Sequence, residues 1–600
     1  MKRLKNLLMF IVMALPFVFC SLFLRLYVGK VTLDGMMGEV FPVIFDAFWI
    51  VLLCTLCLVL PKTAGRILYA FLLIVFSVWT FANYIYHCVF KQFLWISDIS
   101  MASEGTDYFE VVFNYASPLV IVLLILSLVL FIFFVSKCSD FGFKRLKGVV
   151  IAICVLGICV TDAVFLQIAR AQLNNGAWEV WQRPALIYNE YKDSKKALYT
   201  SGLYQYTCKS IDKMLKKDDT DIETQKQFAK DFFKSNTDNE MTGILKGKNV
   251  IFVLMESIDD FLICEEYTPE IKRMMDEGIN FTNHFSPNMG TGYTFNSEFA
   301  ANTGFYCPTN ASSASVYTKN MYPQTIANRL KNQGYTTSAI HFNSRQFYNR
   351  EVMYKKWGYD TYHCLMDYMS IEKCVIDSDA IRDDKVYSLI TQNKPFMTYF
   401  ITYSAHLPYN IEDNKLKGIR KYYPDKYNGN EEIDTLRLLA YDTDVFFKLL
   451  NQRLEEEGIA EDTVIVAYTD HYAYGINDSE LLRNESIKAG SEILEKTPFF
   501  IYCKGMESKE VVKVTSTVDI APTLENLLGL EKMNAYIGND AFSDDKGLVH
   551  FADGRWFDGN FMFNPDLANE KTSYIDDINK YITDAQRVND FVVEYDYFRE

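Results

Sequence analysis

The sequence predicts a protein of two parts, an α-helical membrane domain of five spans followed by an α/β domain. The chain has 600 residues, which is too many for one compact domain, and its apolar residues gather in roughly the first 170 positions. Five apolar runs in that part each approach the roughly 20 residues that a membrane-spanning helix needs. From residue 246 onward, short apolar runs of strand length alternate with amphipathic stretches of helical length, which is typical of an α/β domain.

The predicted spans lie at about 6–27, 41–60, 67–90, 116–136 and 148–168. No small-residue cleavage site closely follows the first run, and four more spans come after it, so we interpret it as a retained anchor rather than a signal peptide. Lys and Arg gather before span one and in the loops that join spans two and three and spans four and five. By the positive-inside rule the N-terminus is cytoplasmic and everything after about residue 169 lies outside the cell. We therefore predict a multi-pass protein of a bacterial cell membrane with an extracellular α/β domain.

The predicted division is a membrane domain at 1–168, a helical extracellular linker at 169–245 and the α/β domain at 246–600. The linker is polar and mostly helical in pattern. It begins with the sequence ARAQ at 169–172, a small-x-small site that a signal peptidase could cut.

The composition excludes one class of partner. The net charge of −15 argues against nucleic acid, because such surfaces need clustered Lys and Arg. The thirteen cysteines have no metal-ligand spacing, although Cys364 and Cys374 could close a short loop as a disulfide outside the cell.

Polar residues follow the apolar runs of the predicted sheet at the point where each strand ends. Glu256 follows NVIFVLM, Asp470 and His471 follow TVIVAYT, and His406 and His341 close two further runs. In open parallel sheets the ligand site lies beyond the carboxyl ends of the strands. Each residue alone could be a turn former, a helix cap or a hydrogen-bonded histidine. Together they predict a divalent-metal site with oxygen and nitrogen ligands.

Thr294 opens the predicted helix TFNSEFAAN after Gly290 and Gly292. One interpretation is an N-cap that satisfies the first free N–H groups of the helix. The other is a nucleophile, because a helix N-terminus stabilises anions and a metal lowers the pKa of a hydroxyl. The residues alone leave both interpretations open.

Seven motifs resemble the lipoteichoic acid synthase family of the alkaline phosphatase and sulfatase superfamily. They are NVIFVLMES, GTGYTFNSEF, FYNREVMYKKWGYD, SAHLPY, YTDHYAYG, TPFFIY and DIAPTLENLLG, and their order and spacing match the family along the whole chain. The resemblance implies a sulfatase-like catalytic domain in which one manganese-type ion is bound, with magnesium or zinc as alternatives. The implied ligands are Glu256, Thr294, Asp470 and His471, with Thr294 also the nucleophile. The resemblance also implies that Tyr348, Arg350 and His406 hold a glycerophosphate head group.

Two positions depart from the family pattern. Tyr348 stands where the family usually has Trp, and Thr469 stands where Gly usually precedes the Asp-His pair. The sulfatase branch is disfavoured, because Cys307-Pro308-Thr309-Asn310 lacks its Cys-x-Pro-x-Arg pattern.

The resemblance thus implies a membrane-anchored phosphoglycerol transferase. It would move glycerophosphate from phosphatidylglycerol to a surface glycan, glycolipid or glycerophosphate polymer through a phospho-threonine. A phosphoethanolamine transferase of the same superfamily and a non-catalytic membrane protein that binds surface polymer remain alternatives.

Overall fold

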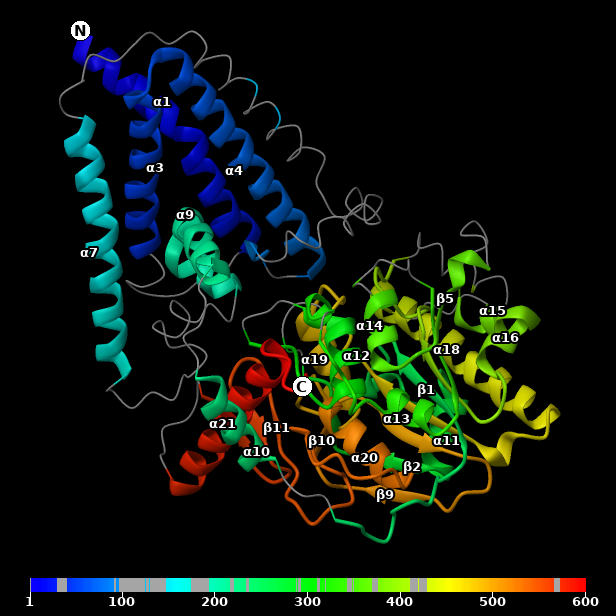
Figure 1. Cartoon of the computed structure of the whole chain (residues 1–600). Helices are drawn as coiled ribbons and strands as arrows, with labels where there is room; N and C mark the ends of the chain where they lie inside the picture. The colour runs from blue at the N-terminus through cyan, green and yellow to red at the C-terminus, as the bar shows by residue number, and fades with distance from the viewer. Residues whose placement is uncertain are drawn as a thin grey trace. The chain divides into compact units, whose positions relative to one another are not determined.

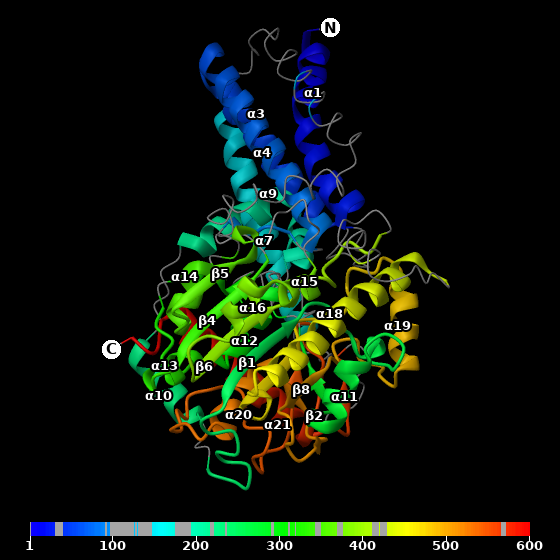
Figure 2. The same ribbon diagram turned by 90° about the vertical axis from the view of Figure 1, so that its right-hand side faces the viewer.

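The computed structural model describes residues 2–29, 40–90, 93–96, 125, 129, 147–173, 194–215, 221–233, 237–287, 289, 293–309, 313–318, 320–342, 348, 350–368, 376–410, 419, 429–565 and 572–599. These residues form two compact units, a helical one in the N-terminal part of the chain and an α/β one that begins at Thr220 (Figures 1 and 2). Each unit is described by itself.

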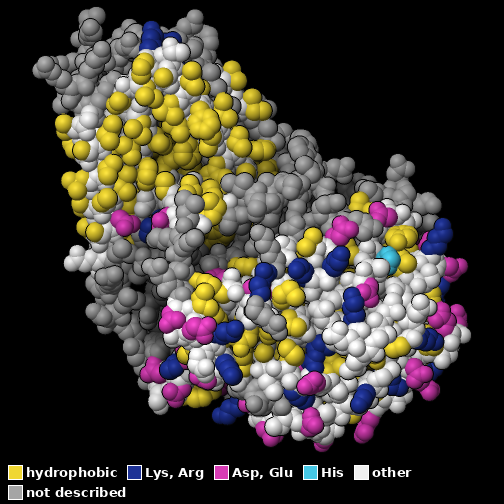
Figure 3. Space-filling model, viewed as in Figure 1, with side chains coloured by type: hydrophobic (Ala, Val, Ile, Leu, Met, Phe, Trp, Pro, Cys, Tyr) yellow, Lys and Arg dark blue, Asp and Glu magenta, His cyan; other side chains and the backbone are white. Residues whose placement is uncertain are grey.

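The helical unit contains four described helices that are long and apolar enough to cross a membrane. The candidate spans are Phe10–Val28, Phe41–Val59, Lys62–His87 and Gly148–Phe165. Hydrophobic side chains cover much of the visible surface of this unit, as expected of helices that face lipid (Figure 3). The helices are α1 (Lys2–Leu22), the π-helical η1 (Phe23–Gly29), α3 (Phe41–Val59), α4 (Lys62–Phe90), α7 (Lys147–Leu173) and α9 (Ser194–Leu215).

Four of the five predicted spans therefore correspond to candidate spans, whereas most of the predicted span at 116–136 lies outside the described residues. The ARAQ segment at 169–172 lies within α7, so its backbone is helical. The domain boundaries stay a prediction.

Helix α9 is part of the helical unit, where it packs against α1, η1 and α3. It is interrupted at Gly202, whose φ of 74° belongs to the left-handed region. A Cβ at this position would meet Asp46 Oδ1 at 2.5 Å. Two tyrosines of α9 hold the helix in place, because Tyr204 donates to the carbonyl of Phe17 and Tyr206 donates to the carbonyl of Leu94.

The α/β unit is built on a central sheet of eight strands in the order β5-β4-β6-β1-β7-β8-β2-β9. The five strands from β5 to β7 are parallel, and β8 pairs antiparallel with both β7 and β2. The strands are β1 (Asn249–Met255), β2 (Ile279–Phe281), β4 (Thr336–His341), β5 (Thr361–Cys364), β6 (Phe396–Ile401), β7 (Thr463–Thr469), β8 (Phe499–Tyr502) and β9 (Lys509–Val511).

Helices cover both faces of this sheet (Figure 2). The central strands are therefore buried along their whole length and read as continuous apolar runs. On one face Ile251, Val253 and Met255 of β1 join a core with α11, α15, α16 and α18. On the other face Phe252 packs on aromatic rings of β6 and β7.

The remaining elements surround the central sheet. The helices are α10 (Ile222–Phe232), α11 (Pro269–Glu277), α12 (Tyr293–Thr303), α13 (Ile326–Asn332), α14 (Arg350–Trp357), α15 (Asp377–Arg382), α16 (Asp384–Ile390), α18 (Glu431–Glu456), α19 (Ser479–Lys488), α20 (Ile520–Leu527) and α21 (Ser573–Glu594). Short 3₁₀ turns are η3 (Asp260–Leu262), η4 (Ala314–Val316), η6 (Leu365–Asp367), η8 (Ala460–Asp462) and η9 (Thr517–Asp519). Two small sheets pair β3 (His284–Phe285) with β10 (Thr515–Ser516), and β11 (Val549–His550) with β12 (Trp556–Phe557) and β13 (Met562–Phe563).

Candidate active site

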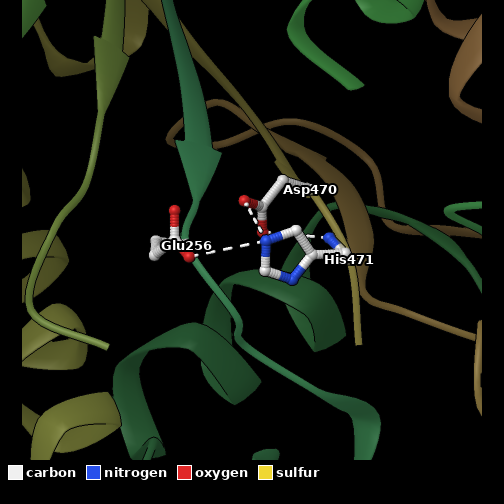
Figure 4. Close-up of side chains that lie close together, drawn as sticks. All are labelled: Glu256, Asp470 and His471. Atoms are coloured by element: carbon white, nitrogen blue, oxygen red, sulfur yellow. Dashed lines mark hydrogen bonds and ion pairs between the residues drawn. The ribbon is translucent and has the colours of Figure 1, made fainter. Parts of the chain in front are cut away.

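The pairing of β1 with β7 brings the predicted metal ligands together. These two parallel strands are neighbours, and Met255 pairs with Thr469 at their carboxyl ends. The residues that follow, Glu256 and Asp470, therefore leave the sheet side by side, and His471 comes next (Figure 4). One ligand atom from each of the three buried side chains lies within 4.8 Å of the others.

The imidazole of His471 lies between the two carboxylates. Its Nε2 atom is 3.0 Å from Asp470 Oδ2 and 3.5 Å from Glu256 Oε1. Its other ring nitrogen, Nδ1, is 3.1 Å from the carbonyl oxygen of Tyr472. Because a carbonyl can only accept, Nδ1 carries a proton, so a neutral ring would present the lone pair of Nε2 to the space between the carboxylates.

The backbone around Glu256 also holds the cluster in place. Ser257 has a positive φ of 54°, and its N–H donates to Asp470 Oδ1 at 2.9 Å. The Ser257 hydroxyl donates to Glu256 Oε1, and the N–H of Glu256 donates to Thr402 Oγ1. A left-handed serine costs backbone energy, and such strain is concentrated at functional sites.

Thr294 is the second residue of α12, not the residue that precedes the helix. Its hydroxyl donates to Glu256 Oε2 at 3.3 Å and lies 3.4 Å from His471 Nε2. The N-cap interpretation therefore does not describe this side chain, which faces the carboxylate and the imidazole. Gly290 and Gly292 lie outside the described residues.

The cluster carries more negative charge than its surroundings accommodate. Burial, with the charge of Asp470 next in size, raises the pKa of Glu256 to about 8. Burial opposes protonation of His471, but Asp470 and Glu256 outweigh it and raise the pKa of His471 to about 9. Both shifts favour additional positive charge between the carboxylates.

A divalent cation fits this donor set. Two carboxylates, a neutral imidazole and a hydroxyl suit ions such as manganese and magnesium, and zinc also accepts them. Asp470 Oδ2 is buried and accepts no hydrogen bond of good geometry from the described residues, although Nε2 lies nearby. A buried carboxylate oxygen of this kind is ordinarily satisfied by a donor or an ion.

Arg350, predicted to bind the head group, lies buried at the start of α14. Its Nη2 and Nε atoms donate to the carboxylate of Glu298, which also accepts the hydroxyl proton of Tyr354. Sequence reasoning missed Glu298, although its place four residues after Thr294 puts both on one face of α12. The Nε and Nη2 atoms of Arg350 therefore donate to protein rather than to a substrate.

Tyr348 contacts Arg350, and His406 lies in a separate segment that follows β6. The Tyr348 ring lies 5.2 Å from the guanidinium of Arg350 and stacks on Phe295 of α12. His406 follows β6 and stacks on Tyr403, and its Nδ1 is 2.7 Å from the carbonyl of Leu407. His341 ends β4, where burial lowers its pKa well below the usual value. The burial favours a neutral imidazole there.

The chain is similar in sequence to known proteins. Residues 248–530 match the family model described as Sulfatase. The lipoteichoic acid synthase-like protein YvgJ of Bacillus subtilis is 27% identical over 541 residues, which cover 84% of this chain and 82% of that protein. The chain therefore contains a sulfatase domain and is similar to lipoteichoic acid synthases over most of its length. Lipoteichoic acid synthase 2 of Bacillus subtilis is 24% identical over 79% of this chain and 74% of its own length.

A solved structure shares the fold of this lipoteichoic acid synthase-like chain. The lipoteichoic acid synthase LtaP from Listeria monocytogenes superimposes with a TM-score of 0.52 and 21% identity. The superposition covers 62% of this chain and 98% of that one.

One departure from the lipoteichoic acid synthase pattern is explained by packing. Thr469 is fully buried, and its hydroxyl donates to the carbonyl of Ile258 in the loop after β1. Its own carbonyl accepts a proton from the Ser286 hydroxyl. The threonine therefore ties the end of β7 to the loop that follows β1, next to the proposed ligands.

Proposed function

We propose that this chain is a metal-dependent phosphoglycerol transferase that moves glycerophosphate from phosphatidylglycerol to a hydroxyl of a cell-surface acceptor. The acceptor is a glycan, a glycolipid or a growing glycerophosphate polymer. The proposal depends on one observation, the approach of the Thr294 hydroxyl to both Glu256 and His471 at the carboxyl ends of β1 and β7.

The proposed reaction has two steps. In the first step Thr294 Oγ1 attacks the phosphorus of phosphatidylglycerol, and the bond from phosphorus to the diacylglycerol oxygen breaks. Diacylglycerol leaves with a proton, and a phospho-Thr294 ester that carries glycerol remains. In the second step the acceptor hydroxyl attacks the same phosphorus, loses its proton and restores the Thr294 hydroxyl.

The proposed ligands Glu256, Thr294, Asp470 and His471 would hold the metal. A bound divalent ion lowers the pKa of a coordinated hydroxyl and offsets charge on phosphoryl oxygens. Glu256 accepts the hydrogen bond of Thr294 and thereby orients the oxygen that attacks. The N-terminus of α12 adds a favourable dipole for the phosphoryl group, because Thr294 is its second residue.

We propose phosphatidylglycerol rather than phosphatidylethanolamine as the donor. A neutral glycerol group offers two hydroxyls and suits the neighbourhood of Arg350 and His406. An ethanolamine ammonium would need a carboxylate partner instead, and the Glu298 carboxylate is already paired with Arg350. Tyr348 provides a ring face for the glycerol carbons and a hydroxyl for its oxygens.

Phosphatidylglycerol labelled in the glycerol head group tests the donor and the reaction class. We expect the label to move to an acceptor while diacylglycerol is released, with slower release from phosphatidylethanolamine in matched micelles. A chain that cleaves phosphatidylethanolamine faster is a phosphoethanolamine transferase. A chain that cleaves neither lipid supports the polymer-binding alternative.

The Thr294→Ala variant tests the nucleophile. Release of diacylglycerol should fall by more than about 1000-fold, since loss of a catalytic nucleophile has effects of that order or larger. Unfolding should change little, because the lost hydrogen bond to Glu256 contributes only about 1 kcal/mol. Thr294→Ser keeps the hydroxyl and should retain measurable turnover. Wild-type rates in the alanine variant would contradict the covalent mechanism.

We also propose the topology that the loop charges imply, with five spans in 1–168 and the linker 169–245 and catalytic domain 246–600 outside the cell. Protease added to intact spheroplasts should then remove the catalytic domain from the membrane. A domain that is protected until lysis would contradict the topology and the access to surface acceptors.

A further inference from the structure

The loop that follows β6 connects two parts of the proposed site. Thr402, its first residue, accepts the N–H of Glu256 through its hydroxyl oxygen at 2.8 Å. Tyr403 comes next, and the His406 ring stacks on it with the ring centroids 5.3 Å apart. The position of this loop therefore determines where His406 lies relative to Glu256.

Asp377, the first residue of α15, anchors the loop through a fully buried carboxylate. It accepts the N–H of Tyr403 at 2.7 Å, the N–H of Ser404 at 3.1 Å and the hydroxyl of Thr443 at 2.9 Å. The N–H of Asp377 donates in return to Ser404 Oγ at 2.8 Å. Three donors converge on one side chain, so only a group that accepts through both oxygens satisfies them all.

Asp442 of α18 forms a second buried anchor for the same loop. Its Oδ2 accepts the Ser404 hydroxyl at 2.7 Å and the N–H of Ser378 at 3.2 Å, while its Oδ1 accepts the Ser378 hydroxyl. The hydroxyl of Ser404 therefore bridges Asp442 and the backbone of Asp377. Helices α15 and α18 fix the loop from two directions.

Holding a loop with two adjacent buried carboxylates costs desolvation free energy. Burial, with the neighbouring charge of Asp442 next in size, raises the pKa of Asp377 to about 7. Well-packed apolar residues commonly stabilise a fold as much as buried charges do, or more. The arrangement is better explained by the geometric precision of charge-assisted hydrogen bonds than by stability.

We propose that Asp377 and Asp442 are positioning residues that set the place of His406 at the head-group site. The inference rests on the proposed function only in taking His406 to contact the glycerophosphate. Neither carboxylate touches the substrate. Each acts through the backbone and hydroxyl of the loop.

The test is a double-mutant cycle on the full chain in detergent with manganese present, read as the affinity for glycerol phosphate by calorimetry. Asp377→Asn and His406→Ala should each weaken binding by about 10-fold, since one lost charge-assisted hydrogen bond has an effect of this order. The double variant should bind no more than about 2-fold more weakly than His406→Ala alone. Asp377 acts through the position of His406, so its loss has little further effect once the imidazole is gone. Ser404→Ala is a milder variant for the case in which Asp377→Asn does not fold.

Asp444→Asn is the matched control. Asp444 is also a buried carboxylate of α18, but it accepts the N–H of Ile271 and belongs to a different contact. Its variant should bind glycerol phosphate like the wild type.

The inference is overturned if Asp377→Asn and Ser404→Ala both bind glycerol phosphate with wild-type affinity. It is also overturned if the losses of affinity in the two single variants multiply in the double variant. A wild-type chain that does not bind glycerol phosphate would overturn it as well. The proposed function is decided separately, by the turnover of labelled phosphatidylglycerol.

Discussion

At the scale of single residues, α12 presents two functional side chains on one face. Thr294 faces the carboxylate and imidazole cluster, and Glu298, one turn later, holds Arg350. The same turn of helix therefore places both the proposed nucleophile and the guanidinium predicted to bind the head group. A shift of this helix would move both together.

We expect Glu298→Gln to destabilise the chain and to impair binding of the lipid donor. Both Glu298 and Arg350 are buried, and removing one partner of a buried ion pair typically costs about 3 to 5 kcal/mol. The measurement is thermal unfolding of the full chain in detergent together with KM for phosphatidylglycerol. Tyr354→Phe is the control, because it keeps the ion pair and removes one hydrogen bond worth about 1 kcal/mol. Unchanged unfolding in Glu298→Gln would contradict the role of the pair.

The clustering of the proposed metal ligands could be predicted from sequence, and the support of Arg350 could not. Glu256 and the Asp470-His471 pair directly follow continuous apolar runs, and such runs are typical of central parallel strands that end at one edge. Glu298 lies inside a helix, where a buried acid has the same sequence signature as an exposed one. The positive φ of Ser257 also has no signature, because serine is common in ordinary turns.

At the scale of elements, a side chain of α18 supports the start of α11. Asp444 of α18 accepts the N–H of Ile271 at 2.8 Å near the start of α11. A carboxylate at a helix start satisfies free N–H groups and interacts favourably with the helix dipole. The long apolar periodicity of TLRLLAYDTDVFFKLLNQRLEEEG indicates a helix in the sequence, and α18 covers most of this stretch. It could not predict which partner Asp444 contacts.

The Asp444 contact predicts a pH dependence. Burial raises the pKa of Asp444 from 3.8 to about 7, so between those values the folded chain keeps a proton that the unfolded chain releases. The contribution of Asp444 to stability therefore falls as pH rises through this window, by no more than about 4 kcal/mol. Asp444→Asn lacks this titration, so its melting temperature relative to wild type should rise between about pH 4 and pH 8.

The control is Asp462→Asn, since this side chain is largely exposed. This variant removes an exposed carboxylate and is measured over the same pH series. An Asp444→Asn difference that stays constant between pH 4 and pH 8 would contradict the raised pKa of Asp444.

The interruption of α9 predicts a second effect at the element scale. Gly202→Ala should destabilise the helical unit, because alanine at a positive φ costs about 1 to 2 kcal/mol and its Cβ would displace Asp46. Gly148→Ala in α7 is the matched control, since its Cβ would meet no atom within 4 Å. Thermal unfolding of both variants in detergent measures the difference. Equal melting temperatures would contradict the contact.

At the scale of the whole molecule, we expect chelation to abolish turnover and to lower thermal stability together. An ion that binds only the folded chain stabilises it by about 2.7 kcal/mol at 100 times its dissociation constant. Manganese added back should restore both properties. Asp470→Asn is the control, because its melting temperature should respond less to the chelator. Full activity after exhaustive chelation would contradict a metal-dependent reaction.

The order of the strands has a consequence for biogenesis. Strand β1 is made early, yet it lies between β6 and β7, and β7 is the last to be synthesised of the five adjacent parallel strands from β5 to β7. The proposed ligands on either side of this pairing come together only after the chain has been synthesised beyond His471. With the topology proposed above, the cytoplasm never meets a complete site. The identity of the bound ion is then decided by the metals available at the cell surface, and not by those that the cytoplasm buffers.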